Sequence, residues 1–240
     1  MAKHKVSHQF ITREMYLLKP RYTNYIEMKN ILIIASLLFA GALQSSAQLI
    51  TAESFEKINI DKYDGQADKK HQYVPAADKL KPRFEIDKNN QLASSQIIEL
   101  SGMDKNKIYD NVNVWFKKTF ADKASTIQTN DKEKGQLVVN TLLKNIVKFP
   151  HQVVGVNMTV KIDVKDGKIR LTNIINNYII NAGTEWNAKK CYPFYDEQDA
   201  LRKKVSSSGY VVACTFADIV AEQLKEAAKP KVVQDSDDDW

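Results

Sequence analysis

Few residues in this chain have the types and spacing that chemistry requires. Beyond residue 47 the sequence has two histidines, His71 and His151, and two cysteines, Cys191 and Cys214. This part of the chain has no Gly-x-Ser-x-Gly nucleophile elbow and no His-x-x-x-His metal pair. A metal site would have to gather four scattered residues in one place. The sequence therefore predicts a protein without a catalytic, cofactor or metal site.

One kind of catalytic site leaves no trace in the spacing of residues. Glycosidases use two carboxylates whose separation is set by the tertiary structure. A hydrolase of unrecognised type with a carboxylate-based site therefore stands as the alternative to a non-enzymatic function.

Cys191 and Cys214 are a candidate disulfide pair. A bridge between them would close a loop of about 23 residues and stabilise the fold by about 3 kcal/mol in the chain-entropy model. Two buried thiols acting as small apolar side chains are the other interpretation. The sequence leaves both open.

A cluster of aromatic residues precedes the last predicted helix. Trp186, Tyr192, Phe194 and Tyr195 lie within ten residues and are interrupted by Pro193. Such a cluster is a candidate contact surface for a partner. The interpretation we favour is plainer: the segment crosses the sheet, and its aromatic side chains complete the core.

The segment from Met28 to Ala47 has the three parts of a cleavable secretory signal. A lysine follows Met28, residues 31–43 form an apolar run of 13 residues, and small residues precede a cut between Ala47 and Gln48. A membrane-spanning helix needs about 20 apolar residues. We therefore expect export, cleavage before Gln48, and no stable membrane span afterwards. Met28 is a better start for such a signal than Met1, because residues 1–27 would make its positive region unusually long.

The charge balance argues against a nucleic-acid partner. The whole chain has 35 basic and 29 acidic residues. Residues 1–47 contain six of the basic and two of the acidic ones, so 29 basic and 27 acidic residues remain. A chain this close to neutrality has no broad field for a phosphate backbone.

Composition divides the chain into four parts. Residues 1–47 are the N-terminal extension and signal peptide. Residues 48–83 are predicted to be a flexible tether, since ten of the 23 residues from position 61 onward are charged. Residues 84–229 form the folded domain, and residues 230–240 form an acidic tail.

The clearest structural pattern in the domain is a β-hairpin over residues 156–172. Apolar residues alternate strictly with polar ones, and Asp166-Gly167 predicts a two-residue type I′ turn. This register places Val164 opposite Ile169, Ile162 opposite Leu171 and Asp163 opposite Arg170. One face of the sheet is then buried, and the wet face carries charges of mixed sign together with a threonine. The residues on that face are Lys161, Asp163, Arg170 and Thr172.

Two helices are predicted along the chain, one between strands and one after the last strand. An apolar stripe follows a candidate N-cap at Asp104. A last helix is expected from Tyr210 to Lys229, after the Ser206–Gly209 run. With further strands at 83–87, 96–100, 126–129 and 136–140, the order is β-β-α-β-β-β-β-α. The predicted fold class is α+β: an antiparallel, curved sheet covered on one face by helices.

Several segments resemble a known family. They are Phe84-Glu-Ile-Asp87, Ile97-Ile-Glu-Leu100, Lys107-Ile-Tyr-Asp110, Trp115-Phe116, Lys132-Glu-Lys-Gly135 and Lys165-Asp-Gly-Lys-Ile-Arg170. Over residues 83–181 the chain is similar to a bacterial domain-of-unknown-function family with a TATA-binding-protein-like fold, found in exported proteins of Gram-negative bacteria. The resemblance implies a curved antiparallel sheet backed by helices, and it implies no known activity. The name describes a shape and gives no reason to expect DNA binding.

We therefore expect an exported domain that works as a non-catalytic binding or interaction module of the cell envelope. It would lie in the periplasm or at the outer surface of a Gram-negative bacterium, and its partner would be an envelope protein or a glycan. No cofactor is expected.

Overall fold

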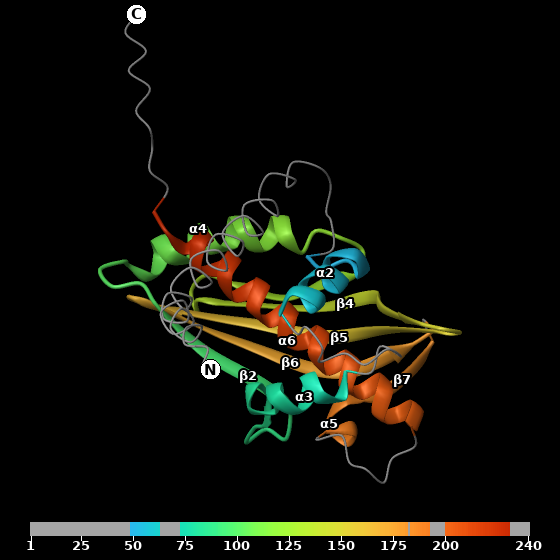
Figure 1. Ribbon diagram of the computed structural model, residues 1–240. Coiled ribbons are helices and arrows are strands. Elements are labelled where there is room, and N and C mark those ends of the chain that lie inside the picture. Colours follow the sequence, from blue (N-terminus) through green and yellow to red (C-terminus); the bar gives the residue numbers. More distant parts are fainter. Residues whose placement is uncertain (1–48, 63–72, 182, 193–199, 231–240) are drawn as a thin grey trace, which may run out of the picture. The chain divides into compact units, whose positions relative to one another are not determined.

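The computed structural model describes residues 49–62, 73–181, 183–192 and 200–230. The signal peptide predicted within residues 1–47 lies outside the described residues, and so does the predicted acidic tail of residues 230–240 beyond Pro230. Figure 1 shows the described residues as a sheet with helices packed on one side of it.

The sheet has seven antiparallel strands, in the order β1-β2-β6-β5-β4-β3, and β7 pairs with the far end of β6. The long central strands form because β-branched and other apolar residues alternate with polar ones. The strands are β1 (Glu85–Ile86), β2 (Leu92–Glu99), β3 (Ser125–Asp131), β4 (Gln136–Phe149), β5 (Gln152–Lys165), β6 (Lys168–Ile180) and β7 (Thr184–Asn187).

The predicted hairpin is present with the predicted register. Val164 pairs with Ile169, Ile162 with Leu171 and Asp163 with Arg170. The turn type is corrected: Gly167 has a φ of +70°, whereas Asp166 is not in the positive-φ region, so the turn is not type I′. The carboxylate of Asp166 instead accepts a hydrogen bond of 2.7 Å from the backbone N–H of Lys105.

Helix α4 (Lys105–Thr119) forms as predicted. The side chain of Asp104 caps its first turn by accepting a 3.0 Å hydrogen bond from the backbone N–H of Lys107. The buried stripe of α4 packs on the sheet and consists of Ile108, Tyr109, Val112 and Phe116.

Helix α6 (Ala200–Ala228) begins ten residues before the predicted start at Tyr210. The Ser206–Gly209 run, expected to interrupt the chain, lies buried inside this helix. Its small side chains allow α6 to approach the sheet closely, and the three serine hydroxyls donate to backbone carbonyls three residues earlier. A run of small residues occurs both in closely packed helices and in loops, and composition alone does not distinguish the two.

The predicted tether at residues 48–83 is corrected wherever the structure describes it. Helices α2 (Ala52–Lys62) and α3 (Val74–Leu80) and the 3-10 helix η1 (Lys81–Arg83) form there. Five apolar residues of these segments join the core: Ile50, Phe55, Tyr73, Ala76 and Ala77. The many charged residues of this segment led to the prediction of a tether. The few apolar residues are enough to fix the segment, because the rest of the domain supplies the core against which they pack. Residues 63–72 lie outside the described residues.

Segment 80–84 is fixed to the rest of the domain by two side chains of α6. The hydroxyl of Tyr210 accepts from the backbone N–H of Phe84 at 3.2 Å and lies 2.9 Å from the carbonyls of Leu80 and Lys81. Arg83 also forms a two-pronged ion pair with Asp218 of α6. The folded domain therefore begins well before the predicted boundary at residue 84.

The fold class is confirmed: an open, curved, antiparallel seven-stranded sheet with helices on one face. Short helix α5 (Ala188–Cys191) and strand β7 were not predicted, because each has only four residues.

Candidate functional site

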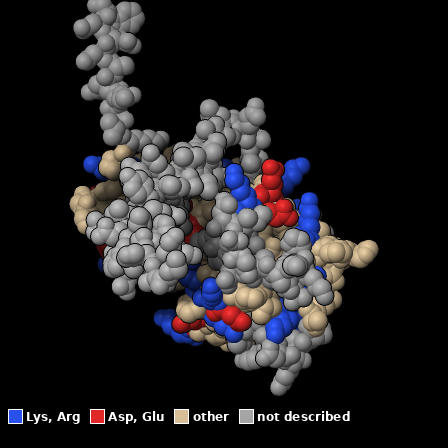
Figure 2. All heavy atoms as spheres, viewed as in Figure 1, with Lys and Arg blue, Asp and Glu red and all other residues tan. Residues whose placement is uncertain are grey.

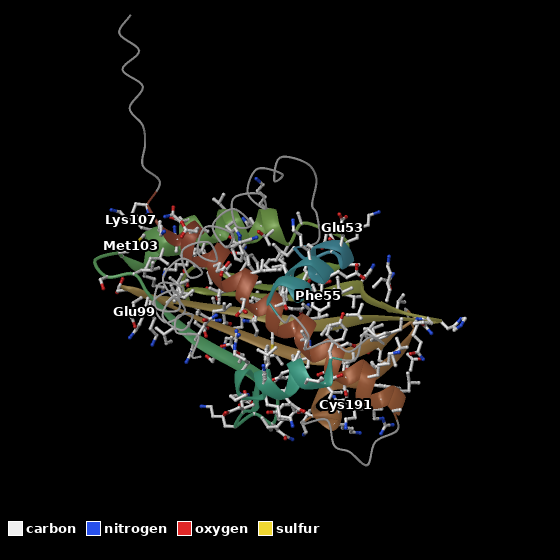
Figure 3. The ribbon with its side chains drawn as sticks, in the orientation of Figure 1. Glu53, Phe55, Glu99, Met103, Lys107 and Cys191 are labelled. Atoms are coloured by element: carbon white, nitrogen blue, oxygen red, sulfur yellow. The ribbon has the colours of Figure 1, made fainter. Side chains whose placement is uncertain are left out.

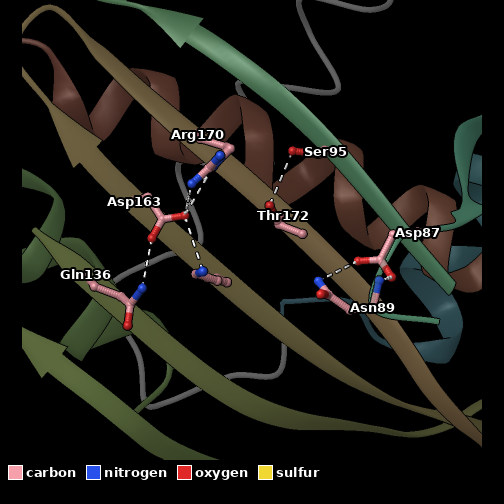
Figure 4. A network of polar contacts seen from close by, with 8 residues as sticks. Asp87, Asn89, Ser95, Gln136, Asp163, Arg170 and Thr172 are labelled. Carbon is pink, nitrogen blue, oxygen red and sulfur yellow. Dashed lines mark hydrogen bonds and ion pairs between the residues drawn. The ribbon is translucent and has the colours of Figure 1, made fainter. Parts of the chain in front are cut away.

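No helix among the described residues covers the side of the sheet away from α4 and α6. Successive side chains of a strand point to opposite faces. In β5, Val160, Ile162 and Val164 are buried toward the helices, while Lys161 and Asp163 between them are partly exposed. Figure 4 views this open face, with the helices behind the strands.

The strand register arranges the open face in three rows, each of which crosses five strands in the order β2, β6, β5, β4, β3. The first row is Ile97, Arg170, Asp163, Gln136 and Asp131. The second is Ser95, Thr172, Lys161, Val138 and Thr129. The third is Ala93, Ile174, Thr159, Asn140 and Thr126.

Asp163 is the centre of the first row. One carboxylate oxygen accepts from the side-chain amide of Gln136 at 2.9 Å. The other accepts from Arg170 at 3.0 Å and 3.2 Å and lies 3.5 Å from the Lys161 ammonium. Burial alone would raise the pKa of Asp163, but the two hydrogen-bond partners and the positive charges outweigh it and lower the pKa below its ordinary value. The carboxylate is therefore ionised, and the neighbouring positive charges of Arg170 and Lys161 compensate its negative charge.

The other rows are joined by uncharged polar side chains. The hydroxyls of Ser95 and Thr172 lie 3.3 Å apart (Figure 4). Thr159 donates to Asn140 at 2.7 Å. Asn176 donates to the hydroxyl of Thr159 at 3.0 Å and to Asn157 at 3.3 Å. These bonds hold the side chains flat along the sheet, so that the open face is a pre-ordered layer of hydroxyl and amide groups.

Apolar side chains lie among these polar groups. Ile97 is 52% exposed, and Val138, Leu142 and Ile174 are half-buried. None of the residues in the three rows is aromatic. The face therefore combines a compensated charge, hydrogen-bonding groups and aliphatic patches, without the ring platforms on which sugars or bases stack.

Three of the segments that carry the family resemblance, residues 97–100, 132–135 and 165–170, meet the start of α4 at one end of the sheet. Figure 3 shows Glu99, Met103 and Lys107 together at this end, and Cys191 at the other. The Gly167 N–H donates to the carbonyl of Met103, and the Lys105 ammonium donates to the carbonyl of Glu133 at 2.6 Å. The N-terminus of α4 is thus already occupied by the chain's own groups, and these segments hold the fold together.

Tyr109 joins α4 to the β3–β4 hairpin at the same end. Its hydroxyl donates to Asn130 at 2.6 Å, and Asn130 donates to Asn113 at 2.9 Å. Burial, together with the carboxylates of Asp131 and Asp110, raises the pKa of Tyr109. The tyrosine is therefore a neutral structural link.

The predicted cysteine pair lies in the core. Cys191, at the end of α5, and Cys214, in α6, are both buried thiols, and no disulfide joins them in the structure. Burial raises the pKa of the Cys191 thiol, which makes it less reactive. Both cysteines lie near the buried hydroxyl of Tyr178, whose pKa is raised by burial and by these neighbours.

The predicted aromatic contact surface is only partly described. Trp186 lies in β7, packs on the core, and has the Arg202 guanidinium 5.5 Å from its ring. Tyr192 packs 5.9 Å from the ring of Tyr210 and donates to the carbonyl of Lys81 at 3.1 Å. Both side chains thus take part in packing the domain. Phe194 and Tyr195 lie outside the described residues.

The histidines do not form a site in the described residues. His151 lies in the β4–β5 turn, exposed and with a φ of +65°. His71 falls in segment 63–72, which is not described. No group of three or more histidine, cysteine, aspartate or glutamate side chains in the described ranges is placed to hold a metal ion.

A small cavity of about 10 Å³ lies between Leu49, Phe120, Leu143 and Phe216, which is room for about one water molecule. One buried carboxylate oxygen of Asp122, which also lines the cavity, has no hydrogen-bond partner among the described residues. The cavity is too small for a substrate.

Charges on the helix side are mixed. Figure 2 shows acidic and basic side chains next to one another on the described surface of that side. None of the helices in the described ranges has the length and apolar character that a bilayer crossing requires.

The sequence analysis had found only part of the open face. It placed Lys161, Asp163, Arg170 and Thr172 there, and the structure confirms that these four lie together. It missed the contributions of β2, β3 and β4, because their register with the central hairpin depends on strand order. The alternation in those strands is the signal that would have found them once the order was known.

Comparison with known proteins agrees with this architecture. Residues 95–175 match the family described as a domain of unknown function, DUF4468, with TBP-like fold. A DUF4468 family protein from Bacteroides ovatus is 16% identical, with a TM-score of 0.50 over 65% of this chain and 97% of that chain. A TBP-like protein from Parabacteroides distasonis is 18% identical, with a TM-score of 0.49 over 60% of this chain and 97% of that chain.

No curated protein matches this chain. At 16% identity the Bacteroides ovatus structure shows the fold alone, and that fold is the one built above from strand order and register. The family and the fold that the sequence resemblance implied are thereby confirmed: residues 95–175 match DUF4468, a domain of unknown function with a TBP-like fold.

Proposed function

We propose that this protein is an exported, non-catalytic binding module of the cell envelope, and that it holds a protein partner against the open face of its sheet. The observation that carries the proposal is the pre-ordered polar layer of that face. Its side chains are fixed to one another by hydrogen bonds although no described helix covers them. A surface fixed in advance loses little conformational entropy when a partner binds.

The chemistry of the face favours a protein over a glycan or a nucleic acid. The Asp163 carboxylate lies against both Arg170 and Lys161, so the centre of the face has an excess of only one positive charge, which is too little for the broad field that a phosphate backbone requires. Exposed Ile97 and the half-buried aliphatic side chains beside it suit the apolar atoms of a protein surface.

The state of Asp163 also supports a non-catalytic role. A carboxylate-based hydrolase needs one carboxyl group that stays protonated near neutral pH. The pKa of Asp163 is lowered, which excludes it as that acid, and the pKa of Asp131, the other carboxylate in the first row, is lowered as well.

Site-specific photo-crosslinking in the native bacterium tests the proposal. The full-length protein would carry a photoreactive amino acid either at Thr172, on the open face, or at Val114, which is 60% exposed on α4. We expect one discrete crosslinked protein from position 172 and none at the same mass from position 114. Adding Ile97→Lys should abolish that species, because it places a charge beside the partner's apolar atoms.

The same cells test the location. Fractionation should place the protein in the envelope, with a mature N-terminus at Gln48 by mass spectrometry. Recovery from the cytosol with residues 31–43 still attached would contradict the envelope role. An equal crosslinking pattern from positions 172 and 114 would contradict the role of the open face.

A further inference from the structure

The small cavity at the C-terminal end of α4 is enclosed by parts of the chain that are far apart in sequence. Thr119 and Phe120 end the helix, and Asp122 lies in the loop that leads to β3. Leu49, Phe216 of α6 and two residues of β4 complete the lining. Four residues of this lining carry polar side chains: Thr119, Asp122, Ser125 and Thr141.

The side chain of Asp122 brings an unused hydrogen-bond acceptor to this cavity. Its Oδ1 atom is buried and accepts no hydrogen bond from the described residues. A buried oxygen without a donor has lost its hydration and gained nothing in exchange. Most such atoms in folded proteins are therefore satisfied by another protein group or by an ordered water molecule.

The hydroxyl pair of Ser125 and Thr141 brings an unused donor. The two hydroxyl oxygens lie 3.0 Å apart, which allows one hydrogen bond between them. Whichever hydroxyl donates in that bond, the other keeps its own hydrogen. Among the described residues no acceptor bonds to that hydrogen, and neither hydroxyl reaches Asp122 directly. The same cavity thus holds a donor and an acceptor that lie too far apart to bond to each other.

The size and the chemistry of the cavity select a water molecule as its ligand. A volume of about 10 Å³ has room for about one water, and a buried water needs about two to four polar partners. Water can accept the hydroxyl hydrogen and donate to the carboxylate at the same time, whereas a metal cation cannot accept a hydrogen bond. Calcium would also need about six to eight oxygen ligands, and Asp122 is the one carboxylate in the lining.

We propose that this cavity binds a structural water molecule, which accepts a hydrogen bond from the Ser125–Thr141 hydroxyl pair and donates one to Oδ1 of Asp122. The water joins the α4–β3 loop to β4. It does so on the covered face of the sheet, beside Phe216 of α6. The proposal is therefore independent of what binds to the open face.

A double-mutant cycle in the full chain tests the bridge in solution. Asp122→Ala and Thr141→Val are made singly and together, and urea unfolding gives the folding equilibrium constant of each variant. Because both changes break the same bridge, the double variant should fold about two- to tenfold more favourably than the two single losses combined would predict. Asp122→Ala with Thr172→Val, which removes a hydroxyl of the open face, is the control pair and should show independent losses. Independent losses in the first pair would overturn the proposal.

A high-resolution crystal structure of the full chain tests the identity of the ligand without any substitution. We expect one spherical density peak at about 2.7 to 3.0 Å from Asp122 Oδ1 and at a similar distance from one of the two hydroxyl oxygens. A peak surrounded by several oxygens at about 2.4 Å would identify a cation instead of water. That result, or a cavity without density, would refute the bridge.

Discussion

The two faces of the central sheet are formed by the same strands, but their side chains make different contacts. On the covered face α6 lies so close that a Cβ atom added to Gly209 would be 2.3 Å from the ring of Tyr178. On the open face the side chains touch mainly their cross-strand neighbours, through hydrogen bonds such as that between Thr159 and Asn140. At this contact on the covered face there is no space for a larger side chain. Packing does not explain which residues occupy the open face. We therefore expect that face to carry a function other than stabilising the fold.

The sharpest test of this contrast is Gly209→Leu. The new side chain would meet the Tyr178 ring, and we expect it to destabilise the domain by at least about 3 kcal/mol. Urea unfolding followed by circular dichroism measures the change. Glu222→Leu, on the exposed side of the same helix, is the control and should change stability by less than about 0.5 kcal/mol. Equal midpoints for the two variants would mean that α6 does not press on the sheet as described.

A second variant asks whether the covering layer includes the residues before position 84. Phe55 of α2, labelled in Figure 3, is fully buried. Its ring lies 5.8 Å from that of Tyr73. Phe55→Ala should cost about 3 kcal/mol, since a large ring leaves a cavity. The same unfolding measurement applies, with the exposed Lys57→Ala of the same helix as control. A loss no larger than that of the control would restore the tether interpretation.

The smallest effect is expected on the open face, from Asp163→Asn. The folded-state pKa of Asp163 is lowered, so its contribution to stability is present above the unfolded pKa of about 3.9 and is lost as the pH falls through the folded value. Wild type should therefore exceed the variant by about 1 kcal/mol above pH about 5, and the difference should shrink below pH about 4. Unfolding midpoints measured across this range report it.

Arg170→Gln serves as the partner variant in this measurement. It removes one cause of the lowered pKa, so the double variant should lose less than the sum of the two single losses. A wild-type advantage that grows toward low pH would have the wrong sign for an ionised, hydrogen-bonded carboxylate.

Local patterns predicted those parts of the fold in which neighbouring residues decide the outcome. The alternation from Val156 to Val164 and the short turn fixed the β5–β6 register, and Asp104 fixed the start of α4. The failures share a cause. The Ser206–Gly209 run and the charged stretch before residue 84 look like loops to any local rule, because the partners that bury them are distant in sequence. Tyr178 lies 31 residues before Gly209, and Tyr210 lies 126 residues after Phe84.

By itself, the sequence determined the presence of six of the seven strands, helix α4 and the single covered face, because hydrophobic periodicity and capping act within a few residues. It also placed four polar residues on the wet face of the central hairpin. Only the tertiary structure decided what stands beside them: Gln136 against Asp163, Ser95 against Thr172, and an open edge at β3. Those neighbours follow from strand order, which is set by the global packing of helices on the sheet and not by any local segment.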